Sequence, residues 1–473
     1  MLCGAETFIK MTYPTPSRQH FPDDFIWGVA TSSFQIEGAH LADGKGPSVW
    51  DTFCEVKGKI ADGSNGHVAC EHYQRWPEDV QLIADLGVNA YRFSMSWPRV
   101  QPDGQGAWNE AGFAFYDRLI DALSARGVAL HLTLNHWDLP QALQDQGGWA
   151  NRETCAHFTR YATEVARRFG SRLASICTHN EPWVIAILGY EQGIFAPGIQ
   201  SRSQAMQAVH HLLLSHGMAC QAMRGLGLTT PMGIVLNLSP IYPASQSPED
   251  LAKAKLDDGL ILRLYMDALY RGSYPQDVIS HLAEDAPQVQ AGDMATIAQP
   301  LDFLGVNYYT RNFSSSGNPW DVASTGNQVT DMGWEVYPQG LTELLCRLHQ
   351  DYQPKLLLVT ENGAAFKDEY KDGVINDTQR LDYVRDHIAA TYAAHQQGVP
   401  VGGYFAWSLM DNFEWASGYA KRLVQAHKLH HATIGKEGGV SFGFVFARDP
   451  AKLKADLKKQ REAGTAIVRD AAI

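Results

Sequence analysis

Eight short apolar runs recur along the chain, each followed by a segment with a different hydrophobic spacing. The runs are Phe25–Ser33, Asn89–Trp97, Ala129–Trp137, Ala174–Pro182, Met232–Ser239, Asp302–Thr310, Leu356–Gly363 and Gly402–Asn412. They are apolar throughout instead of alternating, which indicates strands buried on both faces. The segments between them place apolar residues three and four positions apart, as at Phe113, Tyr116 and Ile120, and this spacing predicts helices. Eight strand-then-helix units predict an α/β protein built as a single closed (β/α)8 TIM barrel.

Two of the connections are longer than a barrel needs. Residues Tyr242–Pro300 contain one clear helical pattern, near Leu251–Tyr270, and a polar remainder. Residues Arg311–Tyr337 have almost no hydrophobic periodicity. Long irregular loops in a compact domain usually serve as lids or binding loops. Because both follow predicted strands, we expect both on the face of the barrel where active sites are built.

The bulk composition indicates one large domain and excludes several kinds of partner. The 473 residues carry a formal net charge of −12, and 45% of them are hydrophobic. An acidic balance argues against nucleic acid and anionic membranes as partners. No apolar run approaches the roughly 18–20 residues that span a bilayer. We expect residues 1–20 to form an N-terminal extension without the apolar core of a signal peptide, and residues 21–473 to form the barrel domain.

The cysteines are odd in number and scattered. They are Cys3, Cys54, Cys70, Cys155, Cys177, Cys220 and Cys346. None forms a C-x-x-C pair, so neither a zinc site nor a disulfide framework is indicated. Reduced thiols are typical of the cytoplasm, and we expect the protein there.

Two acidic residues stand where a predicted strand gives way to a loop. Glu181 lies in Thr178–Pro182 and Glu361 in Thr360–Gly363. The carboxyl ends of parallel barrel strands meet on one face, so we expect the two acids to lie close together. Either acid alone would more often be a solvated or ion-paired carboxylate. Two carboxyls held together there have one leading use, the cleavage of a glycosidic bond, in which one protonates and the other attacks.

Amide, imidazole, carboxylate and indole side chains stand at the same strand ends. They are Gln35, His136, Trp137, Asn180, Asn307, Tyr309, Trp407, Glu414 and Trp415. A pyranose needs such groups, because its hydroxyls require donors and acceptors and its C–H face packs on an aromatic ring. We therefore expect a sugar-binding pocket around the acids.

Several longer motifs, in a fixed order, carry a family resemblance. They are Phe25–Gly38, Tyr91–Trp97, Asn135–Pro140, Asn180–Pro182, Gly305–Tyr309, Thr360–Gly363 and Trp407–Trp415. From about Phe21 through Arg422 the chain resembles glycoside hydrolase family 1, the β-glucosidase family. The resemblance implies a (β/α)8 barrel and retaining hydrolysis of β-linked sugars from the non-reducing end.

The resemblance also implies roles for single residues. Glu181 would be the general acid/base and Glu361 the nucleophile. Arg92 and Tyr309 would hold the nucleophile ionised and oriented, and Asn180 would donate to the sugar 2-hydroxyl. A retaining pair stands about 5–5.5 Å apart, so that the charge on one carboxyl raises the pKa of the other and keeps it protonated.

The sugar-contacting residues follow in the same way. Gln35, His136, Glu414 and Trp415 match the positions that bind the outer hydroxyls, and Trp407 matches the platform beneath the ring. Trp183 and Leu188 fall where the family shapes the entrance and the aglycone side; ordinary packing at a helix start is the equal alternative.

The acid at Glu414 bears on the substrate. Family members that act on 6-phosphorylated sugars carry a small polar residue there, and a carboxylate would repel a dianionic phosphate. The expected function is therefore a β-glucosidase acting on small β-glucosides and oligosaccharides such as cellobiose, with side activity on β-galactosides and β-fucosides. A 6-phospho-β-glucosidase and a catalytically silent sugar-binding relative are the alternatives. No cofactor or metal is expected.

The tail departs from the family. After Arg422 the family continues directly into a Phe-Gly motif, whereas residues 423–441 intervene here before Phe442. We interpret 423–441 as an insertion in the barrel domain; the alternative is an unrelated sequence that replaces the family's ending. His427 and His431 have a spacing that can hold a metal on a helix, but no third ligand pattern accompanies them, and a solvated helix face is the preferred interpretation.

Overall fold

Eight parallel strands close into a barrel in the computed structural model, which describes residues 16–367, 370–371, 374–375 and 377–421. The order around the barrel is β1-β12-β9-β7-β5-β4-β3-β2. The bounds are β1 Ile26–Ala30, β2 Ala90–Ser94, β3 Ala129–Asn135, β4 Ser175–Asn180, β5 Met232–Asn237, β7 Phe303–Asn307, β9 Leu357–Asn362 and β12 Val401–Trp407. Seven of these strands lie within the runs identified in the sequence, and β12 begins one residue before its run, so the predicted (β/α)8 barrel is confirmed.

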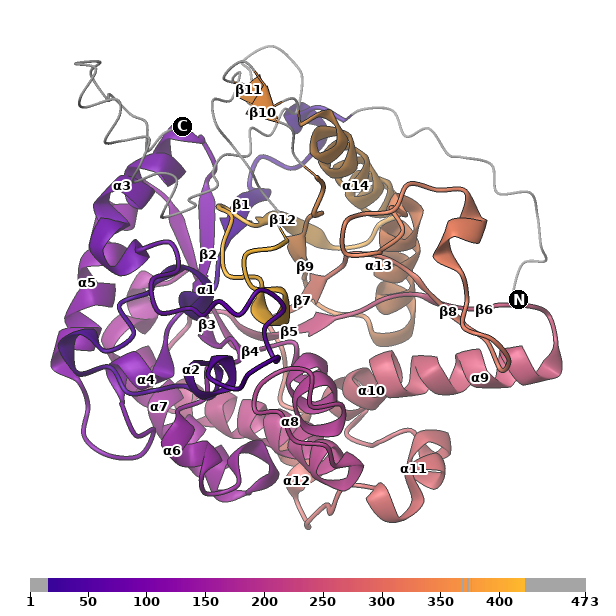
Figure 1. Ribbon diagram of the computed structural model, residues 1–473, viewed down its shortest axis with the longest axis horizontal. Coiled ribbons are helices and arrows are strands. Elements are labelled where there is room, and N and C mark those ends of the chain that lie inside the picture. Colours follow the sequence, from indigo (N-terminus) through magenta and orange to yellow (C-terminus); the bar gives the residue numbers. More distant parts are fainter. Residues whose placement is uncertain (1–15, 368–369, 372–373, 376, 422–473) are drawn as a thin grey trace.

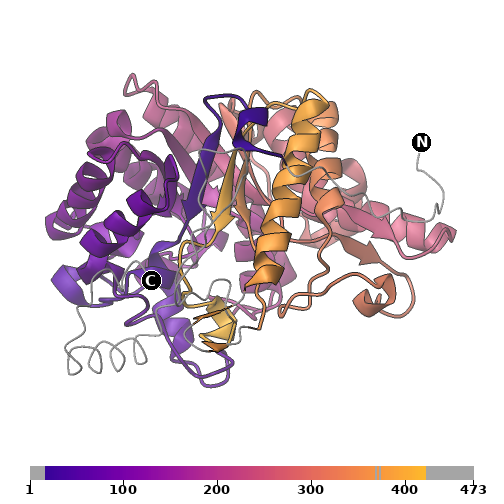
Figure 2. The same cartoon turned by 90° about the horizontal axis from the view of Figure 1, so that it is seen from above.

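Helices surround the barrel on its outside (Figure 1). Their bounds are α1 Ser33–Ile36, α2 Val49–Cys54, α3 His72–Asp85, α4 Trp97–Val100, α5 Glu110–Ser124, α6 Gln141–Gln144, α7 Glu153–Phe169, α8 Arg202–Arg224, α9 Pro248–Asp258, α10 Leu264–Arg271, α11 Gln276–Leu282, α12 Asp293–Ile297, α13 Pro338–Tyr352 and α14 Thr378–Gln396. Figure 2 shows the indigo first strand beside the yellow-orange last strand, which is the contact that closes the barrel.

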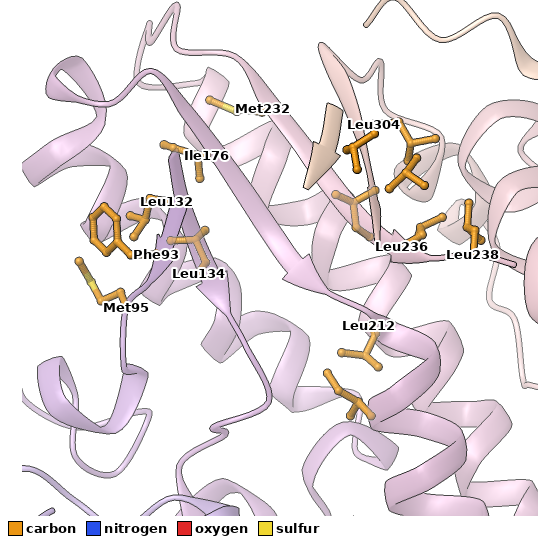
Figure 3. Packing of buried hydrophobic residues seen from close by; sticks show 14 of the residues in the cluster. Phe93, Met95, Leu132, Leu134, Ile176, Leu212, Met232, Leu236, Leu238 and Leu304 are labelled. Carbon is orange, nitrogen blue, oxygen red and sulfur yellow. The ribbon is translucent and has the colours of Figure 1, made fainter. Parts of the chain in front are cut away.

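The strands are apolar throughout because each of their faces meets a different core. Outward-facing Leu132 and Ile176 belong to the same large hydrophobic cluster as Leu212 of α8, and all three, labelled in Figure 3, are fully buried. Inward-facing Val235 and Phe303 belong to a separate cluster inside the barrel. Each such side chain contributes about 1.5–3 kcal/mol to folding by leaving water. The predicted burial of both strand faces therefore follows from two concentric hydrophobic layers.

The two long connections contain more structure than the sequence indicated. In the first, a π-helical turn at Gly259–Arg263 joins α9 to α10 into the expected helix, while α11 and α12 are short helices that the prediction missed. Their few turns offer too little hydrophobic periodicity to be recognised.

A small parallel sheet ties these two connections together. Strands β6 (Ile241–Pro243) and β8 (Asn312–Ser314) pair with each other. Beside them Arg311 Nε donates to Glu335 Oε2 at 2.8 Å in a buried ion pair. Both connections line the cavity described below, so their predicted placement on the catalytic face is confirmed. A short antiparallel pair, β10 (Tyr370–Lys371) and β11 (Val374–Ile375), follows β9.

Several expectations concern segments outside the described residues. The insertion at 423–441, the motif at Phe442 and the pair His427 and His431 all lie there. Among the helices that the structure describes, none combines the length and the apolar character needed to cross a membrane.

Candidate active site

A cavity of about 260 Å³ opens at the carboxyl ends of the barrel strands. Eleven of the fourteen residues singled out in the sequence line it: His136, Trp137, Glu181, Trp183, Leu188, Asn307, Tyr309, Glu361, Trp407, Glu414 and Trp415. Arg92, Gln35 and Asn180 stand behind its wall, where they bind lining residues or their loops. Both acids thus face one shared space.

Glu361 is held as one partner of a buried ion pair. Arg92 Nη1 donates to Glu361 Oε1 at 2.7 Å, and the hydroxyl of Tyr309 donates to Glu361 Oε2 at 2.7 Å. Arg92 and Glu361 are only 2% and 3% exposed, so water screens this attraction little. A guanidinium and a phenol on its two oxygens stabilise the ionised carboxylate and aim it.

Glu181 is held in the opposite protonation state. Burial raises the pKa of its carboxyl well above the usual value, and the charge of nearby Glu361 raises it further. Its only side-chain hydrogen bond among the described residues comes from Asn307, whose Nδ2 donates to Oε1 at 2.6 Å. The residue has a φ of +49°, an uncommon backbone conformation at the turn after β4. The backbone amide of Glu181 donates to Val235 O at 2.9 Å, which anchors this turn to β5.

Asn180 connects the supports of the two acids. Its Oδ1 accepts from Arg92 Nη2 at 2.6 Å and from Asn307 Nδ2 at 3.1 Å. The donor that binds Glu361 and the donor that binds Glu181 therefore meet on one oxygen. Their relative position is fixed by short polar links across the barrel, between β2 and β4 and between β4 and β7.

Two buried polar atoms face the cavity without a partner among the described residues, His136 Nδ1 and Glu414 Oε2. A buried polar atom left unbonded costs about 1–3 kcal/mol, which a ligand hydroxyl can recover. Burial and the charge of Arg92 lower the pKa of His136 well below its usual value, so its ring is neutral. Burial and Glu361 raise the pKa of Glu414 to about 8.

Aromatic rings form the walls around these atoms. Trp407 and Trp415 lie on either flank of His136, with ring centroids 5.7 and 6.0 Å away. Trp407 ends β12, and Gly363 follows directly after β9, where any Cβ would collide with the Trp407 carbonyl oxygen. Only glycine lets the ends of β9 and β12 approach this closely.

Gln35 does not line the cavity but supports a segment that does. Its Nε2 donates to Asn412 Oδ1 at 2.8 Å and to Phe413 O at 3.0 Å, while its Oε1 accepts from Ser32 at 2.5 Å. The side chain therefore braces the segment that carries Glu414. The sequence placed Gln35 on the sugar, whereas its donors and acceptor are engaged within the protein.

Sequence reasoning missed part of the lining. The further residues are Val184, Phe195, Asn237, Leu238, Ser239, Ile261, Thr310, Asn312, Met332 and Trp334. Met332 and Trp334 lie in the connection Arg311–Tyr337, whose unusual length was the available signal. Asn237 ends β5 beside Asn307 of β7, a neighbour that only the barrel register reveals.

Glycosidic bond cleavage requires two carboxyls held close together, and here they lie at the mouth of a barrel among aromatic rings. These features define the protein's class as glycoside hydrolase. In the part of the chain that the structure covers, no group of three or more His, Cys, Asp or Glu side chains is placed to hold a metal ion. The chain belongs to glycosyl hydrolase family 1, whose model matches residues 17–431.

Individual relatives agree along most of their length. Beta-glucosidase A of Acetivibrio thermocellus is 44% identical over 421 residues, covering 87% of this chain and 94% of that protein. A bifunctional beta-D-glucosidase/beta-D-fucosidase of Bifidobacterium breve is 40% identical, covering 85% of this chain and 92% of that protein. The solved structure of a Thermotoga maritima beta-glucosidase with deoxynojirimycin aligns with a TM-score of 0.83 at 40% identity, covering 91% of this chain and 95% of that one.

Proposed function

We propose that the protein is a retaining β-glucosidase that removes β-D-glucosyl residues from the non-reducing ends of small glycosides. One observation carries the proposal: two carboxyls face one cavity in opposite electrostatic states. Arg92 and Tyr309 support the charge of Glu361, whereas burial keeps the proton on Glu181. These are the requirements for a nucleophile and an acid at one glycosidic bond.

In the first step Glu361 attacks the anomeric carbon while Glu181 protonates the departing oxygen. The bond to the aglycone breaks as the bond to Glu361 Oε forms, and the proton of Glu181 leaves with the aglycone. Esterification removes the charge of Glu361, which lowers the pKa of Glu181. Glu181 is then an anion that can take a proton.

In the second step Glu181 accepts a proton from water, and the resulting hydroxide attacks the anomeric carbon. The ester bond breaks, and the electron pair returns to Glu361, where Arg92 and Tyr309 stabilise the recovering charge. Two inversions leave the sugar with its original β configuration. The enzyme returns to its starting protonation state.

The substrate is proposed to be an unphosphorylated β-glucoside such as cellobiose. The names of the relatives, beta-glucosidase and beta-D-glucosidase/beta-D-fucosidase, support glucosides with a fucoside side activity. Glu414 lines the cavity, where its carboxyl can hydrogen-bond a sugar hydroxyl; because burial and Glu361 raise its pKa to about 8, it repels a dianionic phosphate fully only above that pH. His136 Nδ1 and the ring of Trp407 complete the grip on the terminal sugar. Asn180 at the sugar 2-hydroxyl and Gln35 at the outer hydroxyls remain predictions from the family resemblance, as do Trp183 and Leu188 at the aglycone.

Hydrolysis of p-nitrophenyl β-glucoside tests this function. Wild type should release nitrophenol, and a well-folded wild type without turnover would favour a silent sugar-binding protein instead. Glu361→Ala should abolish hydrolysis. Glu181→Ala should still cleave the activated substrate in part, and added azide should give a β-glycosyl azide; an α-azide would overturn the assignment of the two acids.

A further inference from the structure

A second, much smaller cavity lies inside the barrel, at the root of Arg92. Its volume is about 10 Å³, and its wall includes Arg92 of β2, His131 and Thr133 of β3, and Ser175 and Cys177 of β4. A space of roughly 10–15 Å³ on this measure holds one water molecule. The cavity is closed off from the active site by the guanidinium that binds Glu361.

Polar atoms that lack good partners converge on this space. Arg92 Nε and His131 Nε2 have no hydrogen-bond partner among the described residues. Thr133 Oγ1 has only the thiol of Cys177 beside it, which is a weak partner. The three residues are at most 6% exposed, so bulk water does not reach them. Leaving all three atoms unbonded would cost several times the roughly 1–3 kcal/mol of one such group.

We propose that this cavity binds a single water molecule that joins Arg92 to His131 and Thr133, which makes these two residues positioning residues for the arginine. The water accepts from Arg92 Nε–H and donates to His131 Nε2 and Thr133 Oγ1. His131 Nδ1, which lies 2.8 Å from Ser175 Oγ, then carries the ring proton and donates to that hydroxyl. Every donor and acceptor in the chain is used once, as a buried water with three partners requires.

The charges around His131 agree with these assigned positions of the His131 and Thr133 protons. Burial and the positive charge of Arg92 lower the pKa of His131 to about 4, so the ring is neutral and one nitrogen is free to accept. Thr133 can direct its own proton to the sulfur of Cys177. A charged imidazole at this position would repel the guanidinium, whereas a neutral ring with a water between them attracts it.

The consequence for the reaction is that Arg92 is fixed through all of its nitrogens. Nη1 binds Glu361 at 2.7 Å, Nη2 binds Asn180 at 2.6 Å, and Nε binds the water. The first two partners belong to the reacting site, where Glu361 alternates between a carboxylate and an ester under the proposed function. The water, like the Asn180 amide, is a neutral partner whose charge never changes, so it helps to hold the guanidinium still while the charge of Glu361 comes and goes.

Two measurements test the proposal. A high-resolution crystal structure of the wild type should contain a single peak of density within hydrogen-bond distance of Arg92 Nε, His131 Nε2 and Thr133 Oγ1. A dry cavity, or a different partner on Arg92 Nε, would overturn the proposal. This measurement does not depend on the enzyme's activity, so it stands even if the proposed function fails.

Kinetics test whether the water positions Arg92. His131→Leu removes the acceptor and should lower kcat about ten-fold, the effect of one hydrogen bond to a charged group, with little change in KM. His131→Gln, whose amide can reach the water, should recover most of the rate. His216→Leu is the matched control, because His216 is also buried with an unpartnered Nε2 among the described residues but lies outside this cavity. Equal losses in His131→Leu and His216→Leu, or no recovery in His131→Gln, would refute the positioning role.

Discussion

Removing the phenol hydroxyl from Glu361 tests how the nucleophile is supported. In Tyr309→Phe the ring stays and one hydrogen bond of 2.7 Å to Glu361 Oε2 is lost. Burial raises the pKa of Tyr309 well above its usual value, and the charge of Glu361 raises it further, so the hydroxyl donates throughout the working pH range. The substitution therefore removes one donor and changes no charge.

The size of the effect follows from the charge on the acceptor. A hydrogen bond to an ionised group is worth about 1.5–3 kcal/mol, or about 10- to 150-fold in rate. Under the proposed mechanism Glu361 is a carboxylate before the first step and an ester in the glycosyl-enzyme, and it regains charge as the second step proceeds. Losing the donor therefore slows the second step most, by up to this factor, because only there does the bond strengthen toward the transition state.

Steady-state kinetics with an activated aryl β-glucoside, for which the second step limits turnover, reveal this pattern. In Tyr309→Phe we expect kcat to fall more than kcat/KM and KM to fall with it, because the glycosyl-enzyme accumulates. A burst of aryl alcohol should precede the slow steady state.

The neighbouring tyrosine supplies the control. Tyr308 is fully buried, whereas Tyr309 is partly exposed, and the Tyr308 hydroxyl donates to Tyr337 O at 2.6 Å. Tyr308→Phe should cost stability and leave the ratio of kcat to kcat/KM unchanged. If Tyr309→Phe behaves like Tyr308→Phe, or loses kcat and kcat/KM equally at constant KM, the hydroxyl does not support the charge of the nucleophile.

Three further outcomes follow from the same coordinates. Burial and Glu361 raise the pKa of Glu414 to about 8, so above that pH Glu414→Ser removes a charged carboxylate and should raise the ratio of kcat/KM for a 6-phospho-β-glucoside to that for the plain β-glucoside by about ten-fold or more; an unchanged ratio would show that Glu414 does not exclude phosphate. Because burial and Glu361 raise the pKa of Glu181 well above its usual value, kcat/KM for an aryl β-glucoside should fall as pH rises through that raised pKa; this alkaline limb should be missing in Glu181→Gln assayed with an activated substrate, and its persistence there would assign the limb to another group. Arg99 Nε pairs with Glu37 Oε2 at 2.7 Å, and both side chains are at most 5% exposed. Arg99→Met should therefore lower the free energy of unfolding by about 3–5 kcal/mol in a denaturant titration, and adding Glu37→Gln should recover part of that loss. A loss of stability that the second substitution does not reduce would point to packing instead.

The barrel itself was predictable from the sequence because its signal is local. Each strand had to be apolar on both faces, and each such run therefore stood out over five to ten residues whatever the rest of the chain did. The short helices α11 and α12 were missed for the converse reason, since a helix of two turns carries little periodicity of its own. The pairing of β6 with β8 joins segments far apart in the chain, and no local pattern announces it.

The chemistry was predictable as a set of residue types, and its arrangement was not. Glu181, Glu361 and the groups at the strand ends could be named from motifs, because parallel strands must present their carboxyl ends on one face. Which of these side chains line the cavity, and which bind only other parts of the protein, depended on the structure. Gln35 donates to the segment after β12, and Asn180 accepts from Arg92 and Asn307, so hydrogen-bonding atoms of both side chains are engaged within the protein.

By itself, therefore, the sequence determined the barrel and the family and predicted the two acids, because all of these depend on residue type and on order along the chain. Only the tertiary structure decided how the acids are held, which polar atoms remain open to a ligand, and that His131 and Thr133 converge with Arg92 on one buried space. Those properties depend on distances between strands and on exclusion of water, and both arise only when the barrel closes.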